Sequence, residues 1–139
     1  MEKSPTITVQ IYSGFYNQMI NLQAYTRENG ELVILHTGLK DFVLNIMKEY
    51  MIAGKEPLRY AYHTVCAGER MNVVDCAFSI GTYVVVETGE SGQGTLYTEV
   101  ARNYSYLEAQ KRAFDRAAIS FFQLQLDGRR IFADSELWC

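Results

Sequence analysis

The sequence predicts an α+β domain, built from an antiparallel sheet of about six to seven strands and two main helices at about residues 38–53 and 105–123. Three observations favour this class. Short segments of alternating apolar and polar residues recur along the chain, two longer segments repeat apolar residues at three- and four-residue steps, and an Asn-Gly turn separates two strand-like segments. With no internal repeat or linker, residues 1–139 are expected to form a single domain.

The first half of the chain is expected to form strands and then a helix. Residues 6–12 alternate as a strand does, and Arg27-Glu28-Asn29-Gly30 predicts a hairpin between strands at 21–26 and 31–35. Gly54 is expected to cap the helix at 38–53. The buried face of that helix is expected to carry Leu39, Phe42, Val43, Ile46, Met47, Tyr50 and Met51.

The second half is expected to form strands at 58–65, 72–80, 82–87 and 95–101, with a glycine-rich turn (GESGQG) at 89–94 between the last two. Ser105 and Glu108 have the spacing of a capping box, which predicts that the second helix begins at Ser105. The buried face expected for this helix consists of Leu107, Phe114, Ala117, Ala118, Phe121 and Leu124.

Positive charge is concentrated on this second helix. Residues 101–130 hold six Lys and Arg against three Asp and Glu, whereas the whole chain has a net charge of −3. Arg112 and Arg116 lie one helical turn apart, outside the apolar face, and guanidinium groups suit phosphate oxygens. The alternative is a solvated helix in which Glu108 pairs with Arg112 and Lys111 with Asp115.

Three other residues are candidates for the same ligand site. Arg59 precedes an aromatic strand and would add a third positive group across the sheet. Tyr83 and Tyr97, on strands near the helix, would stack on a base. Each of these tyrosines has the alternative of filling the core or a subunit interface.

No catalytic, cofactor or metal motif stands out, so a binding protein is expected rather than an enzyme. The H-x-T motif of two-histidine phosphoesterases places the histidine and the threonine on the same face of a strand. His36 and His63 are each followed directly by Thr, and neighbouring strand residues point to opposite faces, so neither fits this motif. The sequence has no phosphate-binding loop, zincin motif or nucleophile elbow. Asp75, inside an apolar strand, is expected either to pair with an arginine or to face solvent.

Composition favours a protein of the cytoplasm. The first residues do not resemble a signal peptide, and no apolar run approaches the roughly 20 residues of a membrane helix. Cys66, Cys76 and Cys139 are odd in number and widely spaced, as free thiols are, and the first two are expected in the core. The strand around Tyr83 is so apolar that we expect part of its surface to be covered by other copies of the chain in a homo-oligomer. The alternative is a monomer.

The arginine pattern resembles the Thoeris anti-defence phage protein family. It is carried by Arg59, Arg112 and Arg116, with Phe114 between the helical pair. This resemblance implies a sponge that sequesters cyclic nucleotide immune signals, namely cyclic ADP-ribose isomers and in some members cyclic oligonucleotides, without degrading them. It also implies assembly as dimers or hexamers. Tyr83 stands about where the family has its base-stacking Phe, and the nearby Asn of the family has no clear equivalent.

Two other classes of function compete with this one. The segment 72–124, with EAQKRAFDRAA on its helix, is similar to single-strand annealing recombinases and more loosely to double-stranded RNA-binding domains, although it lacks the glycine that usually follows the helix in annealing proteins. The acidic balance argues against a protein that coats long nucleic acid. A phage inhibitor of a host protein, such as an anti-CRISPR, would use the same Tyr and Arg side chains.

Overall fold

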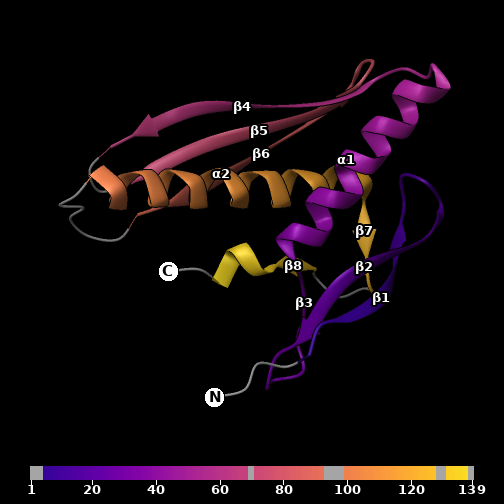
Figure 1. Cartoon of the computed structure of the whole chain (residues 1–139), viewed down its shortest axis with the longest axis horizontal. Coiled ribbons are helices and arrows are strands. Elements are labelled where there is room, and N and C mark those ends of the chain that lie inside the picture. The colour runs from indigo at the N-terminus through magenta and orange to yellow at the C-terminus, as the bar shows by residue number, and fades with distance from the viewer. Residues whose placement is uncertain (1–4, 69–70, 93–98, 128–130, 138–139) are drawn as a thin grey trace.

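The computed structural model describes residues 5–68, 71–92, 99–127 and 131–137, and for residues 99–104 the backbone alone. It has two helices and two sheets, which confirms the α+β class (Figure 1). The strands divide into a five-stranded sheet in the order β7-β1-β2-β3-β8 and a three-stranded sheet in the order β4-β5-β6. All pairs are antiparallel except β3 with β8, which are parallel.

The five-stranded sheet joins the two ends of the chain. Strands β1 (Ile7–Ser13) and β2 (Gln18–Thr26) form a hairpin, and β3 (Leu32–Ile34) follows across the predicted turn, where Gly30 has a φ of 86°. Strand β7 (Leu124–Gln125) pairs with β1, and β8 (Phe132–Ala133) pairs with β3. The short 3-10 helix η1 (Asp134–Leu137) follows β8.

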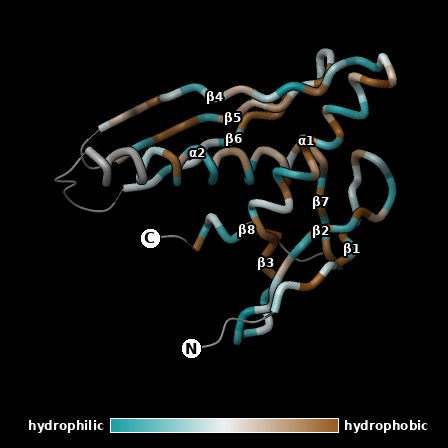
Figure 2. The backbone as a smooth tube through the Cα atoms, viewed as in Figure 1, coloured by the Kyte–Doolittle hydropathy of each residue, from teal (hydrophilic) through white to brown (hydrophobic). Residues whose placement is uncertain are grey.

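Helix α1 (His36–Ala53) matches the predicted helix closely. Gly54 ends it in the left-handed conformation, with a φ of 68°, as expected of a C-terminal glycine. Leu39, Val43 and Ile46 are buried as predicted, whereas Met51 is 75% exposed. The alternation of hydrophobic and hydrophilic segments along α1 is visible in Figure 2.

The three-stranded sheet carries the second helix along one face. Strands β4 (Leu58–Ala67), β5 (Asn72–Ile80) and β6 (Tyr83–Ser91) form an antiparallel meander, and α2 (Glu99–Phe122) packs against β5 and β6 (Figure 1). The covered face supplies Val74, Cys76 and Phe78 to the core. On the other face Val84 and Val86 are each 54% exposed, so no described element covers it.

Aromatic rings fill the space where α2, α1 and the two sheets meet. Phe121 and Phe122, at the end of α2, lie 5.0 Å apart between ring centroids. Phe122 contacts Phe42 of α1, and Phe121 contacts Phe78 of β5. Because these rings come from separate elements and are buried together, they hold the two sheets and both helices in one core.

Several boundaries differ from the prediction. Helix α2 begins at Glu99 rather than Ser105, so the strand predicted at 95–101 is wrong for 99–101, and its other residues lie outside those described. Ser105 is buried inside the helix and bonds to Asn72 and Ser91 instead of capping a terminus. Leu107 was expected in the core but is 47% exposed.

Two further predictions in this region are wrong. Strand β6 extends to Ser91, so the first residues of the predicted glycine-rich turn are part of the strand. Cys66 is exposed rather than buried, and Cys76 is buried as expected. Burial raises the pKa of the Cys76 thiol to about 12, so this thiol stays protonated.

Gly89 sets how closely α2 approaches the sheet. It lies opposite Val74 in the β5–β6 ladder, under the alanine-rich side of the helix. A Cβ atom at this position would lie 2.3 Å from the carbonyl oxygen of Ala109 and 2.3 Å from the amide nitrogen of Ala113. Both atoms belong to helix backbone, so only a shift of the whole helix would make room.

We expect Gly89→Ala to lower the free energy of unfolding by about 2–3 kcal/mol, because α2 must move away from β6. Urea denaturation measures the loss. Gly38→Ala is the control: the closest neighbour of its new Cβ would be Gln23 Cβ at 3.2 Å, a tight contact that needs only a small adjustment, and the helix favours alanine. Equal midpoints for wild type and Gly89→Ala would contradict the close packing of α2.

Candidate functional site

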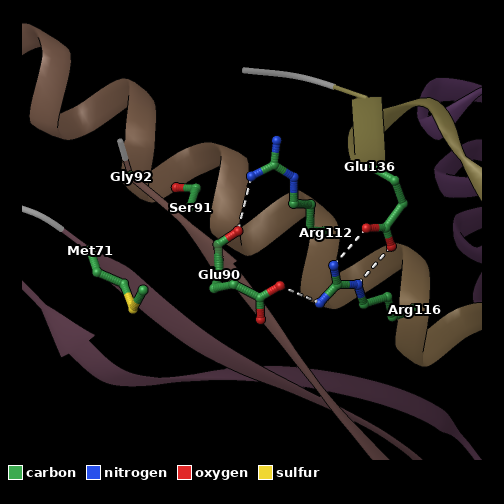
Figure 3. Close-up of a pocket in the computed structure, with 7 residues that line it drawn as sticks. All are labelled: Met71, Glu90, Ser91, Gly92, Arg112, Arg116 and Glu136. Atoms are coloured by element: carbon green, nitrogen blue, oxygen red, sulfur yellow. Dashed lines mark hydrogen bonds and ion pairs between the residues drawn. The ribbon is translucent and has the colours of Figure 1, made fainter. Parts of the chain in front are cut away.

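A cavity of about 290 Å³ lies beside α2 and brings together two of the predicted site residues. Arg112 and Arg116 project into it from successive turns of the helix, as their spacing predicted (Figure 3). The far end of β6 and helix η1 complete it. The lining consists of Met71, Glu90, Ser91, Gly92, Arg112, Arg116 and Glu136.

Arg112 is much more buried than its predicted solvent-facing position implied. Its exposed fraction is 9%. The Nε atom donates a hydrogen bond of 2.6 Å to the carbonyl oxygen of Ser135, and Nη1 donates one of 2.9 Å to the carbonyl oxygen of Glu90. The guanidinium therefore joins α2 to both β6 and η1 through backbone acceptors.

Arg116 is held by two carboxylates. Its Nε and Nη2 atoms donate to the two carboxylate oxygens of Glu136, each at 2.6 Å, in a bidentate pair. Nη1 donates to the carboxylate of Glu90 at 2.9 Å and to the carbonyl oxygen of Thr88 at 2.8 Å. Hydrogen bonding to Glu136 raises the pKa of the guanidinium above its ordinary value; burial opposes this rise, and Glu90 adds to it.

A second polar group lies between the same helix and α1. The Asp115 carboxylate, 1% exposed, lies 2.6 Å from Nδ1 of His36 and accepts a hydrogen bond of 2.6 Å from the Ser135 hydroxyl. Burial raises the pKa of the Asp115 carboxyl, whereas the hydrogen bonds from His36 and Ser135 oppose that rise. The backbone amide of His36 donates to the Asp134 carboxylate at 2.8 Å. His36 therefore links the start of α1 to α2 and to η1.

The electrostatics of the cavity limit what it can bind. Two guanidinium groups face two carboxylates, so the site is close to charge-balanced. Glu136 already provides Arg116 with the two-oxygen contact that a phosphate would make. An anion can replace that contact only by displacing the Glu136 carboxylate from Arg116.

The other predicted site residues lie elsewhere. Arg59 is exposed on β4, and the alternation of that strand puts it on the sheet face opposite α2. The centroid of the Tyr83 ring lies 4.7 Å from that of the Phe121 ring. The Tyr83 hydroxyl donates a hydrogen bond to the carbonyl oxygen of Phe121. Tyr97 lies outside the described residues. The structure thus brings Arg112 and Arg116 together without Arg59 or Tyr83.

Asp75 and His63 share a row on the exposed sheet face. His63 lies opposite Asp75 in the β4–β5 ladder, and Asp75 lies opposite Thr88 in the β5–β6 ladder. The Thr88 hydroxyl donates a hydrogen bond of 2.6 Å to the Asp75 carboxylate. Asp75 therefore lies on the solvent-facing side of the sheet, as one of the two predicted alternatives had it, with a cross-strand hydroxyl rather than an arginine as its partner.

Glu90 and Glu136 were missed as site residues. Glu90 belonged to a segment predicted as a turn, and Glu136 follows Arg116 by twenty residues in a tail without a periodic pattern. A local signal for either pairing is lacking, because both contacts depend on how β6 and η1 pack against α2. The balance of charges in the cavity was therefore not predictable from the helix alone.

Searches for related proteins add no identification. No family model matches this sequence, and neither the curated proteins nor the solved structures gave a significant match. Within the described ranges, no three His, Cys, Asp or Glu side chains are grouped so that they would hold a metal ion. In the same part of the chain neither helix combines the length and apolar character needed to cross a membrane.

We expect Glu136→Gln to lower the free energy of unfolding by about 1–2 kcal/mol, because a partly buried guanidinium loses its bidentate carboxylate. Thermal or urea unfolding measures the change. Glu28→Gln, at an exposed position in the β2–β3 turn, is the matched control and should leave stability unchanged. If both variants have the same unfolding midpoint as the wild type, Glu136 does not anchor η1.

Proposed function

We propose that the chain is a non-enzymatic module that binds unpaired nucleic acid, of the single-strand annealing type. The observation that carries this proposal is the continuous unit of β4, β5 and β6 with α2 along one face. It contains the strand-strand-helix segment whose sequence is similar to annealing recombinases, and it adds a third strand to that segment. The arginine pair that favoured a cyclic nucleotide is largely occupied by internal partners. Binding of unpaired nucleic acid is therefore placed before sequestration of a cyclic nucleotide.

The end of α2 differs from the annealing pattern in its residue but not in its backbone conformation. Annealing proteins usually have a glycine after this helix, and the chain has Gln123 there. Gln123 adopts a φ of 52°, the left-handed conformation that glycine adopts most easily. Its carbonyl oxygen accepts a hydrogen bond from the Gly14 amide, which directs the chain from α2 into β7. The backbone geometry of a glycine is therefore present although the residue is not.

Neither edge strand of the three-stranded sheet pairs with a further described strand, although Arg112 and Arg116 bond to the carbonyl oxygens of Glu90 and Thr88 on β6. Among the described strands, β4 and β6 each pair with β5 alone. A protein that holds a long strand must repeat its binding surface along it, and open edges allow copies of one chain to line up. Both Cys66 and Cys76 are free thiols, which suits the cytoplasm as the place of action.

Net acidity sets the expected strength of binding. With a net charge of −3, the chain can offer only a local basic patch, for which Lys111 of α2 is the candidate, because the Arg112 guanidinium is buried against backbone carbonyls. Lys111 is exposed on α2, and Arg112 lines the cavity next to it. We therefore propose few phosphate contacts per subunit, with bases held by stacking and with affinity that increases as subunits assemble.

We expect Lys111→Ala to weaken binding of a labelled oligo(dT) several-fold and to reduce the salt slope by about one, because one phosphate contact is lost. Fluorescence anisotropy between about 50 and about 200 mM salt measures both. Lys48→Ala, which removes the same charge from an exposed position on α1, is the control and should bind as wild type does.

A companion assay follows the pairing of two complementary labelled strands, which the wild type should accelerate. If oligo(dT) does not bind at low salt, or if complementary strands pair at the uncatalysed rate, the annealing proposal fails. Equal weakening by Lys111→Ala and Lys48→Ala would show that only overall charge matters and would remove α2 from the binding surface.

Sequestration of a cyclic nucleotide is the second candidate. One observation favours it: Arg112 and Arg116 line the same cavity from successive helical turns. In this function the ligand phosphate takes the place of the Glu136 carboxylate on Arg116, the ligand is returned unchanged, and copies assemble as a dimer or hexamer. Arg59 lies on the other sheet face, so a second subunit would have to supply any third guanidinium.

For this second candidate we expect cyclic ADP-ribose isomers or cyclic tri-adenylate to raise the melting temperature, because a ligand of the folded state stabilises it. Arg116→Ala should abolish the shift. Glu136→Gln should retain or enlarge it, since the competing carboxylate is gone, although both variants lower the intrinsic stability. Absence of a shift with every cyclic nucleotide tested would exclude the sponge, and loss of intact ligand by mass spectrometry would indicate catalysis instead.

A further inference from the structure

We propose that a second cleft, between the β1–β2 hairpin and α1, binds a purine or pyrimidine base carried by a nucleotide or by an unpaired strand. The cleft has a volume of about 480 Å³ and shares no lining residue with the cavity beside α2. Such a volume lies in the range of small-molecule sites. Its walls combine three aromatic rings with carboxamide and charged groups, namely those of Tyr16, Phe42, Tyr50, Gln18, Asn45 and Glu49.

Two of the rings are held in place by a contact across the cleft. The hydroxyl groups of Tyr16, from the hairpin, and Tyr50, from α1, lie 2.5 Å apart. The inner face of Tyr16 stacks on Phe122, at 5.9 Å between centroids and 21° between planes. Burial and the hydrogen bond to Tyr50 both raise the pKa of Tyr16, so its phenol stays neutral. The result is a rigid, uncharged aromatic surface, which favours a planar ligand.

The polar groups of the cleft are available to a ligand. Gln18 is exposed at the start of β2, and Asn45 and Glu49 are exposed one turn apart on α1. In the part of the chain that the structure describes, none of these three side chains makes a hydrogen bond or ion pair. A carboxamide offers a donor and an acceptor side by side, which is the pattern on the edge of a base. Glu49 adds an acceptor suited to an exocyclic amino group.

The lining of the cleft includes one positive charge, that of Lys55. The Lys55 ammonium group is 5.3 Å from the centre of the Tyr50 ring, just beyond the glycine that ends α1. A base that enters the cleft brings its sugar and phosphate toward the rim, where Lys55 can reach the phosphate. Aromatic walls, a hydrogen-bonding edge and one cation together match the three parts of a nucleotide.

The site does not depend on the annealing function, except that an unpaired strand is one of its two possible sources of a base. Its test uses the full-length protein labelled with ¹⁵N and titrated with AMP, adenosine and ribose 5-phosphate. We expect AMP and adenosine to shift the side-chain amide signals of Gln18 and Asn45, and ribose 5-phosphate to leave them unchanged. Asn45→Ala should weaken AMP binding at least fivefold, whereas Asn21→Ala, at an exposed position on β2, should not.

Two further titrations identify the source of the base. If a strand supplies it, oligo(dT) shifts the same signals and an oligonucleotide of abasic residues does not. If AMP binds and oligo(dT) does not, the nucleotide site stands while the annealing function fails. If oligo(dT) binds through α2 but neither AMP nor oligo(dT) moves the Gln18 and Asn45 signals, the annealing function stands and the base site is overturned. Equal AMP affinities for Asn45→Ala and Asn21→Ala would also overturn it.

Discussion

The buried carboxylate of Asp115 constrains the arrangement of three elements at once. A carboxylate that has lost its water must have partners, and this one has the His36 imidazole from the start of α1 and the Ser135 hydroxyl from η1. Arg112 and Arg116, on either side of Asp115 along α2, bind the same short helix. The polar contacts of α2 thus determine where η1 lies, and the apolar contacts of α2 determine where the sheet lies.

This division of roles explains why the most basic helix of an acidic chain does not present a simple anion site. Each guanidinium that faces the cavity also holds two parts of the fold together. Burying such groups with acceptors stabilises them, but it also lowers their availability to a ligand. The surfaces that remain unused by the fold are the exposed side of α2, the open face of the three-stranded sheet and the cleft behind α1. A ligand that binds to one of these surfaces would not have to break contacts that hold the fold together.

The sequence was sufficient where structure depends on neighbours in the chain. The α1 helix with Gly54, and the hairpin at Gly30, both follow from local backbone preferences. Prediction failed where distant residues decide. Ser105 resembled a helix cap, but its hydroxyl bonds to Ser91 of β6 in the middle of a longer helix. Arg112 resembled a solvated cation, and only the packing of η1 gives it a backbone acceptor.

The five-stranded sheet also has a consequence for synthesis. Its inner strands leave the ribosome first, whereas β7, β8 and the Asp134 carboxylate that receives the His36 amide are synthesised much later. Until residues 124–134 have been synthesised, β1 and β3 each keep one unpaired edge, and the start of α1 lacks its acceptor. A nascent chain that stalls before these residues are made would therefore expose the edges of β1 and β3 to other polypeptides.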